Sequence, residues 1–132
     1  MRILFIDDDE GFLSLMEGIL RQKGYDIVTA KDGKQAREAL GGEKIDLIIS
    51  DVFMPTLDGI RFHSFVREFT DARDVPFIFI SAHADEHLRN LVVKAANDYF
   101  LRKPVSVEDI LALINNVIGT STKGDAGDAK SG

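Results

Sequence analysis

The sequence predicts an α/β fold in which a parallel β-sheet is covered on both faces by helices. Five short apolar runs alternate along the 132-residue chain with longer amphipathic stretches. Three of these runs are almost unbroken in apolar character, which is typical of parallel strands that are buried on both faces. Strands that alternate with helices form parallel sheets with right-handed connections.

The five predicted strands differ in their expected position in the sheet. Residues 3–6, 45–50 and 75–81 contain the unbroken apolar runs and are expected at its centre. Residues 25–30, with the sequence YDIVTA, partly alternate between apolar and polar side chains, which indicates an edge strand. The fifth strand is expected at residues 99–102.

The first and last predicted helices have the clearest periodicity. Apolar residues in 10–23 recur at spacings of three and four, and Gly24 follows where a left-handed cap belongs. Ser106 is a suitable N-cap for the last helix, in which apolar residues from Ile110 to Val117 share one face. Three weaker helical stretches are expected at about residues 33–41, 58–70 and 85–96.

One domain is expected at residues 1–119, because a chain of 132 residues supports one hydrophobic core. Residues 120–132 contain no large apolar side chain and are rich in Gly, Ser and Asp, so they are predicted to form a disordered tail. The sequence leaves open whether the chain is a complete protein or a part of a longer one.

Composition excludes several classes of function. The net charge of −6 and the pI near 5.0 argue against binding to nucleic acid or to an anionic membrane. The absence of cysteine excludes disulfides, thiolate zinc sites and cysteine nucleophiles, and it fits a reducing compartment. No run approaches 18 apolar residues, and the first ten residues do not resemble a signal peptide. A cytoplasmic location is expected.

Chemically active side chains follow four of the five predicted strands. Asp7 and Asp8 come after the first strand, Asp51 after the third, Ser81 after the fourth and Lys103 after the fifth. Ligands of open parallel sheets bind beyond the carboxyl ends of the strands, near the point where the strand order reverses. We therefore expect these side chains to converge at one edge of the sheet.

Each of these residues, taken alone, has an ordinary structural explanation. A single Asp51 would more often cap a helix or a turn, and Ser81 would more often cap the next helix. Asp9 and Glu10 suit the N-terminus of a helix, and Lys103 alone would be solvated. The convergence of all the predicted groups is what favours a functional site.

Three carboxylates in one pocket need a compensating charge. Two of them about 4 Å apart repel by about 4 kcal/mol at an effective dielectric constant near 20. Oxygen ligands without His or Cys favour Mg²⁺, which also accepts phosphate oxygens as ligands. Mg²⁺ and Lys103 together would balance the charges of Asp7, Asp8 and Asp51, so an aspartyl phosphate is chemically plausible here.

Four segments of the sequence resemble the receiver domain of bacterial two-component response regulators. They are ILFIDDDE, DLIISDVFMPTLDG, PFIFISAHAD and YFLRKPV, and the resemblance covers residues 1 to about 119. It implies a doubly wound, flavodoxin-like sheet of five parallel strands in the order 2-1-3-4-5, flanked by five helices. It also implies a phosphorylation-activated signalling switch that catalyses only its own phosphorylation and dephosphorylation, and is therefore not a conventional enzyme.

The resemblance assigns a role to each residue of the predicted site. Asp51 would accept the phosphoryl group from a sensor histidine kinase or a phosphotransfer protein. Asp8 and Asp51 would bind Mg²⁺ directly, Asp7 would act largely through water, and the Phe53 carbonyl would complete the protein ligands. Ser81 would be the switch hydroxyl.

The resemblance also predicts how the signal leaves the domain. Lys103 would bind the phosphate and precede Pro104 across a cis peptide bond. Phosphorylation would turn Phe100 inward and change the surface of the fourth helix, fifth strand and fifth helix, which controls a downstream protein. The domain would be a monomer or a phosphorylation-dependent dimer.

Three positions depart from the common pattern of the family. Phe100 stands where Tyr is frequent, so a switch there must act by packing alone, and Ser81 replaces the more frequent Thr. Phe53 lies two residues after the acceptor and cannot orient a water molecule by hydrogen bonding, so we predict a long-lived phosphoryl state. His83 is interpreted as a loop residue. Loss of the label within seconds would contradict the prediction for Phe53.

Other readings of the same residues remain open. The segment FIDDDEG resembles the start of haloacid-dehalogenase-like phosphatases, with Asp7 as nucleophile and Asp9 as acid and base, although no further acidic motif follows Lys103. A flavin mononucleotide binder would share the sheet, but its phosphate loop should be rich in Ser, Thr and Gly, and the segment DDDEG is not. A domain that only docks partners is disfavoured, because every chemical group is present.

Overall fold

Five parallel strands form a single sheet in the computed structural model, which describes residues 1–54, 57–69, 74–82, 90, 93 and 96–126. The strand order is β2-β1-β3-β6-β7, which is the order 2-1-3-4-5 when only the strands of this sheet are numbered. The strands are β1 (Arg2–Ile6), β2 (Asp26–Ala30), β3 (Leu47–Asp51), β6 (Phe77–Ser81) and β7 (Asp98–Arg102). The predicted fold class and strand order are confirmed.

Burial separates the central strands from the edges as the sequence predicts. All five residues of β3 and of β6 are buried, and so are four of the five residues of β1. β2, at one edge, buries two of its five residues. This difference arises because central strands have helices on both faces, whereas an edge strand has one open side.

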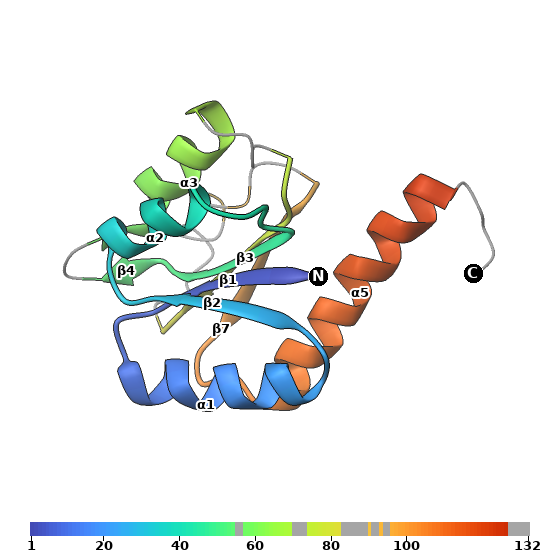
Figure 1. Ribbon diagram of the computed structural model, residues 1–132, viewed down its shortest axis with the longest axis horizontal. Coiled ribbons are helices and arrows are strands. Elements are labelled where there is room, and N and C mark those ends of the chain that lie inside the picture. The colour runs from blue at the N-terminus through green and yellow to red at the C-terminus, as the bar shows by residue number, and fades with distance from the viewer. Residues whose placement is uncertain (55–56, 70–73, 83–89, 91–92, 94–95, 127–132) are drawn as a thin grey trace.

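Four helices lie in the described part of the chain, two on each face of the sheet (Figure 1). α2 and α3 cover one face, and α1 and α5 cover the other. Their bounds are α1 (Glu10–Gln22), α2 (Gly33–Leu40), α3 (Gly59–Phe69) and α5 (Val107–Ala126). Of the helix predicted at 85–96, only residues 90, 93 and 96 are described, so this helix stays a prediction.

The sheet divides the hydrophobic core into two layers, because successive side chains of a strand point to opposite faces. On the face of α2 and α3, Leu4 and Ile6 of β1 pack with Phe62 and Val66 of α3. On the face of α1 and α5, the alternate residues of the strands pack against both helices, among them Ile3, Phe5, Leu13, Met16, Leu20, Ile110, Ile114 and Val117. The apolar stripes predicted for the first and last helices therefore cover the same face of the sheet.

Both ends of α1 have the caps that the sequence predicts. Asp9 caps the N-terminus, since its side chain accepts a hydrogen bond from the backbone N–H of Phe12. At the C-terminus, Gly24 has φ of +95°, and the N–H groups of Gly24 and Tyr25 bond the carbonyls of Arg21 and Leu20. This pair of bonds closes the helix as a left-handed cap.

Two features were not predicted from the sequence. β4 (Phe53–Met54) and β5 (Leu57–Asp58) form a short antiparallel pair after β3. α5 continues to Ala126, although the sequence predicts a disordered tail from Thr120, and residues 127–132 lie outside the described residues. The domain boundary at residue 119 stays a prediction. Among the described residues, no helix combines the length and apolar content that a membrane crossing requires.

Candidate functional site

The register of the sheet brings the predicted site residues to one edge. Ile6 of β1 lies opposite Ser50 of β3, so the next residues, Asp7 and Asp51, emerge side by side. In the neighbouring pair of strands, β6 and β7, the backbone N–H of Lys103 donates to the carbonyl of Ser81, the last residue of β6. This bond sets the start of the loop after β7. The carboxyl ends of β1, β3, β6 and β7 therefore form a common edge, where ligands of such sheets bind.

Three carboxylates meet at this edge, as predicted. One oxygen from each of Asp7, Asp8 and Asp51 lies within 4.8 Å of the other two. Asp7 is fully buried and Asp51 is nearly so, while Asp8 is exposed to solvent. The site therefore has a closed inner side and an open outer side, from which an ion and a phosphoryl donor could approach.

Lys103 lies between two of these carboxylates. Its Nζ is 3.0 Å from Oδ2 of Asp7 and 3.0 Å from Oδ2 of Asp51, and its side chain is 25% exposed. Both contacts are charge-assisted hydrogen bonds, which are stronger than neutral ones. The interpretation of Lys103 as a solvated lysine is thus excluded, and the predicted convergence is confirmed for these three residues.

Burial and charge act against each other at Asp7 and Lys103. Burial raises the pKa of Asp7, and this effect outweighs the hydrogen bonds that Asp7 accepts from the Asp9 backbone and from Lys103. Burial lowers the pKa of Lys103, but its hydrogen bonds to Asp51 and Asp7, together with their charges, raise the pKa overall. Lys103 therefore stays protonated, while burial makes the charged form of Asp7 less favourable.

The donor set fits a hard divalent cation. Three carboxylates and one ammonium leave two negative charges uncompensated, and the site offers oxygen ligands without sulfur or imidazole. Mg²⁺ prefers such ligands and keeps several water molecules, which suits the open side at Asp8. Asp7, Asp8 and Asp51 are therefore the residues that could hold the ion.

The structure describes the remaining predicted residues only in part. Ser81 is buried at the end of β6, and Phe100 is half-buried against the core on the α2 and α3 side. The peptide bond between Lys103 and Pro104 is cis, as predicted. Phe53 lies in β4, the binding of an ion by its carbonyl stays a prediction, and His83 lies outside the described residues.

Comparison with known proteins decides the family. The family model of the response regulator receiver domain matches residues 3–115. This chain belongs to the response regulator receiver domain family.

Individual relatives of this receiver domain are found in bacteria and in plants. It is 32% identical over 120 residues to the alkaline phosphatase synthesis transcriptional regulatory protein PhoP of Bacillus subtilis. This match covers 91% of this chain and 49% of that protein. It is 36% identical over 121 residues to the two-component response regulator ARR12 of Arabidopsis thaliana, covering 89% of this chain and 20% of that one. The chain thus spans less than half the length of these relatives.

A solved structure has the same fold. The receiver domain of the Francisella response regulator 1452 superimposes with a TM-score of 0.81 at 27% identity, and the match covers 91% of this chain and 98% of that one. The matches give no support to the phosphatase alternative. In that reading Asp9 would be an acid and base, whereas in this receiver domain its side chain caps α1.

The contact between Phe12 and Lys103 was not predicted from the sequence. Phe12 was expected only on the apolar face of the first helix, but its ring lies under the ammonium, with Nζ 5.4 Å from the ring centroid. The aromatic residue four positions after the second aspartate is the sequence signal that could have suggested this contact. No pattern of spacing reveals that the two segments meet.

A buried charged cluster at the opposite end of β7 was also missed. Asp98 begins β7 and has a side chain with no exposed area. Its Oδ1 lies 2.8 Å from Nε2 of His63 and 2.8 Å from Nη2 of Arg67, both on α3. This cluster joins α3 to the amino end of β7, far from the carboxyl edge, so its role is structural.

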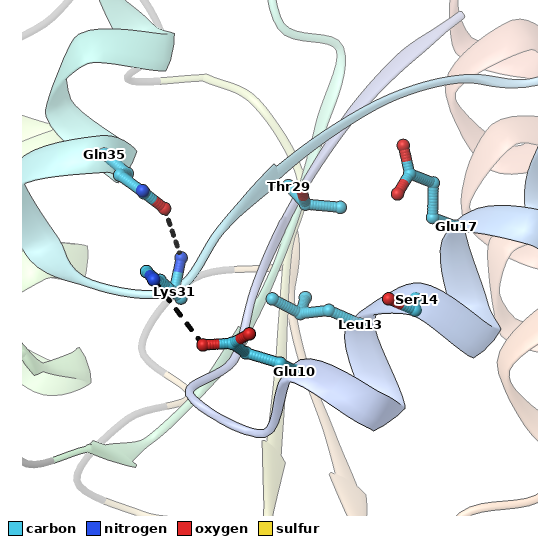
Figure 2. A pocket seen from close by; sticks show the side chains of 7 residues that line it. All are labelled: Glu10, Leu13, Ser14, Glu17, Thr29, Lys31 and Gln35. Atoms are coloured by element: carbon cyan, nitrogen blue, oxygen red, sulfur yellow. Dashed lines mark hydrogen bonds and ion pairs between the residues drawn. The ribbon is translucent and has the colours of Figure 1, made fainter.

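A hollow beside α1 is lined by none of the three aspartates of the site (Figure 2). It measures about 260 Å³, and two contacts join its polar lining residues: Lys31 pairs with Glu10 at 3.5 Å, and the Lys31 backbone N–H donates to the Gln35 side chain. Glu17, on the same wall, pairs with Arg21. The hollow has no group that the receiver chemistry requires.

Proposed function

We propose that this receiver domain accepts a phosphoryl group on Asp51 in a Mg²⁺-dependent reaction and thereby switches a partner protein. The observation that carries the proposal is the position of Asp51: its carboxylate belongs to the three-carboxylate group and shares Lys103 with Asp7. Asp51 is more exposed than Asp7, the other buried carboxylate of the site, so a phosphoryl donor reaches Asp51 more readily.

The donor is a phosphohistidine of a sensor kinase or phosphotransfer protein. An oxygen of Asp51 attacks phosphorus, the P–O bond of the aspartyl phosphate forms, and the P–N bond to the imidazole breaks. The electron pair of the broken bond stays on the imidazole nitrogen, and because the other ring nitrogen already carries a proton, the leaving group is neutral imidazole. The domain thus catalyses its own modification, and the phosphodonor is the substrate that it consumes.

Lys103 has the main task among the chain's own residues. Transfer replaces the single charge of the Asp51 carboxylate by the larger charge of a phosphoryl group, and Lys103 turns its donors from Asp51 to the phosphoryl oxygens. An ammonium that already lies 3.0 Å from the acceptor oxygen requires little rearrangement to stabilise the developing charge. Asp7, Asp8, Asp51 and the Phe53 carbonyl would hold Mg²⁺, which would supply positive charge to the transfer reaction.

The response uses Ser81 and Phe100. The Ser81 hydroxyl moves toward the phosphoryl group, and Phe100 turns inward into the space that this movement leaves. Ser81 ends β6 and Phe100 lies on the neighbouring strand β7, so a displacement at one strand end is transmitted to the next strand. The change reaches the surface of the helix predicted at 85–96, β7 and α5, and a downstream protein recognises it.

Several finer points of this function rest on the family resemblance, on the residue type at Phe53 and on the acidic composition. The phosphoryl state is long-lived because Phe53 cannot orient a hydrolytic water molecule. The partners are proteins rather than nucleic acid or membrane, and the domain is a monomer or a phosphorylation-dependent dimer. A cytoplasmic location fits a partnership with a kinase. Each of these points stays a prediction.

The function is tested by labelling with a small acyl phosphate. The parent protein is incubated with the acyl phosphate and Mg²⁺, and the gain of one phosphoryl group is followed by intact mass measurement. We expect the Asp51→Asn variant to stay unlabelled and the Asp9→Asn variant, which retains a capping side chain, to be labelled like the parent. A label that survives in Asp51→Asn but is lost in Asp7→Asn would instead support the phosphatase reading.

A further inference from the structure

The ammonium of Lys103 has an aromatic neighbour in addition to its two carboxylates. Nζ lies over the ring of Phe12, 5.4 Å from the centroid, which is within the range of a cation–π contact. The ring is itself held by Phe5 of β1 in an edge-to-face arrangement with centroids 5.8 Å apart. Phe5 is buried in the core, so the ring of Phe12 has a fixed backing.

The backbone that carries Phe12 is tied to the same carboxylate that binds Lys103. Oδ1 of Asp7 accepts the N–H of Asp9 at 2.9 Å, and Oδ1 of Asp9 accepts the N–H of Phe12 at 3.1 Å. The other oxygen of Asp7 accepts from Lys103. Asp7, Asp9, Phe12 and Lys103 therefore form a closed ring of contacts, which sets the start of α1 relative to the ammonium.

A largely apolar hollow of about 400 Å³ opens next to this contact. Phe12, Pro104 and Val105 contribute its apolar wall, and Lys103 lies at its margin. A lysine has a flexible stem of four carbons, and this one is partly exposed, so without a contact on that side it could swing toward solvent. Among the described residues that line the hollow, Phe12 is the one whose ring lies under the ammonium.

We propose that Phe12 is a positioning residue for phosphoryl transfer: its ring holds the Lys103 ammonium at the site while the ammonium exchanges Asp51 for the phosphoryl oxygens. This inference rests on the proposed function. An aromatic face attracts a cation without occupying any of its three N–H donors, and the attraction varies little as the donors turn. A carboxylate or amide side chain at position 12 would instead accept from one donor and compete with the phosphoryl group.

Matched variants separate the ring from the bulk of the side chain. Phe12→Leu keeps an apolar side chain in contact with the core and removes the aromatic face, whereas Phe12→Tyr keeps the face. Phe65→Leu is the control, because Phe65 makes a cation–π contact of the same length, 5.4 Å, with Arg37 on the other face of the sheet. All variants are checked for folding by thermal unfolding before labelling.

The measurement is the initial rate of labelling by the small acyl phosphate at saturating Mg²⁺. We expect Phe12→Leu to label about two- to fivefold more slowly than the parent, which is the size of a partly exposed cation–π contact. Phe12→Tyr and Phe65→Leu should label at the parent rate. In a Lys103→Met background, followed over longer times, Phe12→Leu should cause no further loss, because its effect acts through the ammonium.

Three results would overturn the inference. These are an unchanged rate in Phe12→Leu, an equal loss in Phe12→Tyr, or the full loss from Phe12→Leu in the Lys103→Met background. The proposed function fails in a different way, through a parent that gains no phosphoryl group or an Asp51→Asn variant that still gains one. The two failures are therefore distinguished within one set of measurements.

Discussion

Lys103 Nζ lies 3.0 Å from Oδ2 of Asp51, although the two residues are 52 positions apart in the chain. The same nitrogen lies 3.0 Å from Oδ2 of Asp7, at a separation of 96 positions. One ammonium thus joins the carboxyl ends of β1, β3 and β7. The predictions for labelling, ion binding and pH dependence all depend on this junction.

Removal of the Lys103 charge should slow phosphorylation. We expect Lys103→Met, which keeps much of the apolar stem, to label about a hundredfold more slowly with the acyl phosphate, because one preorganised donor to the transferred group is lost. Lys31→Met is the matched control, since Lys31 forms a surface ion pair with Glu10 and is 51% exposed. Equal rates in the two variants would contradict the role of Lys103.

Mg²⁺ should bind to the folded protein through the three carboxylates and stabilise it. At about 100 times the dissociation constant, a ligand of the folded state adds about 2.7 kcal/mol to the free energy of unfolding. We expect Asp8→Asn to weaken Mg²⁺ binding by about tenfold or more in calorimetric titration. Asp9→Asn serves as control, because Asp9 caps α1 and lies outside the three-carboxylate group. Equal weakening in both variants would indicate a diffuse charge effect instead of a site.

The stability of the ion-free protein should depend on pH through Asp7. Because burial raises the pKa of Asp7, the folded state binds its proton more tightly than the unfolded state does. The stability that this proton contributes is fully present below the ordinary pKa of 3.8 and is lost as the pH rises through the raised pKa. The side chain in Asp7→Asn is neutral at every pH, so this variant does not lose stability as the pH rises through the pKa of Asp7.

The measurement for Asp7 is urea unfolding of the parent and of Asp7→Asn between acid and neutral pH, with a chelator present. We expect the two free energies of unfolding to be similar below pH 3.8 and the variant to become the more stable protein as the pH rises. If the parent instead gained stability over the variant with rising pH, the ion pair with Lys103 would outweigh the burial of Asp7.

The cluster at the amino end of β7 should contribute to stability. Asp98 is wholly buried and lies 2.8 Å from both His63 and Arg67, so its removal leaves their polar groups without this carboxylate. We expect Asp98→Ala to lower the free energy of unfolding by about 3 kcal/mol or more. Asp26→Ala is the control: Asp26 also pairs with an arginine at 2.8 Å, but it is 53% exposed and should contribute about 1 kcal/mol or less. Similar losses in urea unfolding would contradict the importance of burial.

Much of the fold could be predicted because its signals are local. The apolar runs of β1, β3 and β6 predict buried parallel strands, and the alternation in β2 predicts an edge, as observed. Gly24 and Ser106 predict helix ends through backbone conformation and capping, and Ser106 accepts the N–H of Asp109 as expected. The end of α5 was predicted less well, because residues after Thr120 have no apolar pattern.

The candidate site was predictable to the extent that topology determines it. Once parallel strands are assumed, Asp7, Asp8, Asp51 and Lys103 must emerge at one edge, and they do. The cluster around Asp98 was not predictable, because His63 and Arg67 lie on a helix whose contacts depend on how it packs across the sheet.

The sequence by itself determined the order of strands and helices and the residue types at the strand ends. Only the tertiary structure decided that Lys103 binds Asp7 and Asp51 together, that Phe12 lies under its ammonium, and that burial raises the pKa of Asp7. The physical reason is that apolar periodicity and capping act over a few residues, whereas electrostatic contacts and burial depend on groups that meet only when the strands pair and the helices pack.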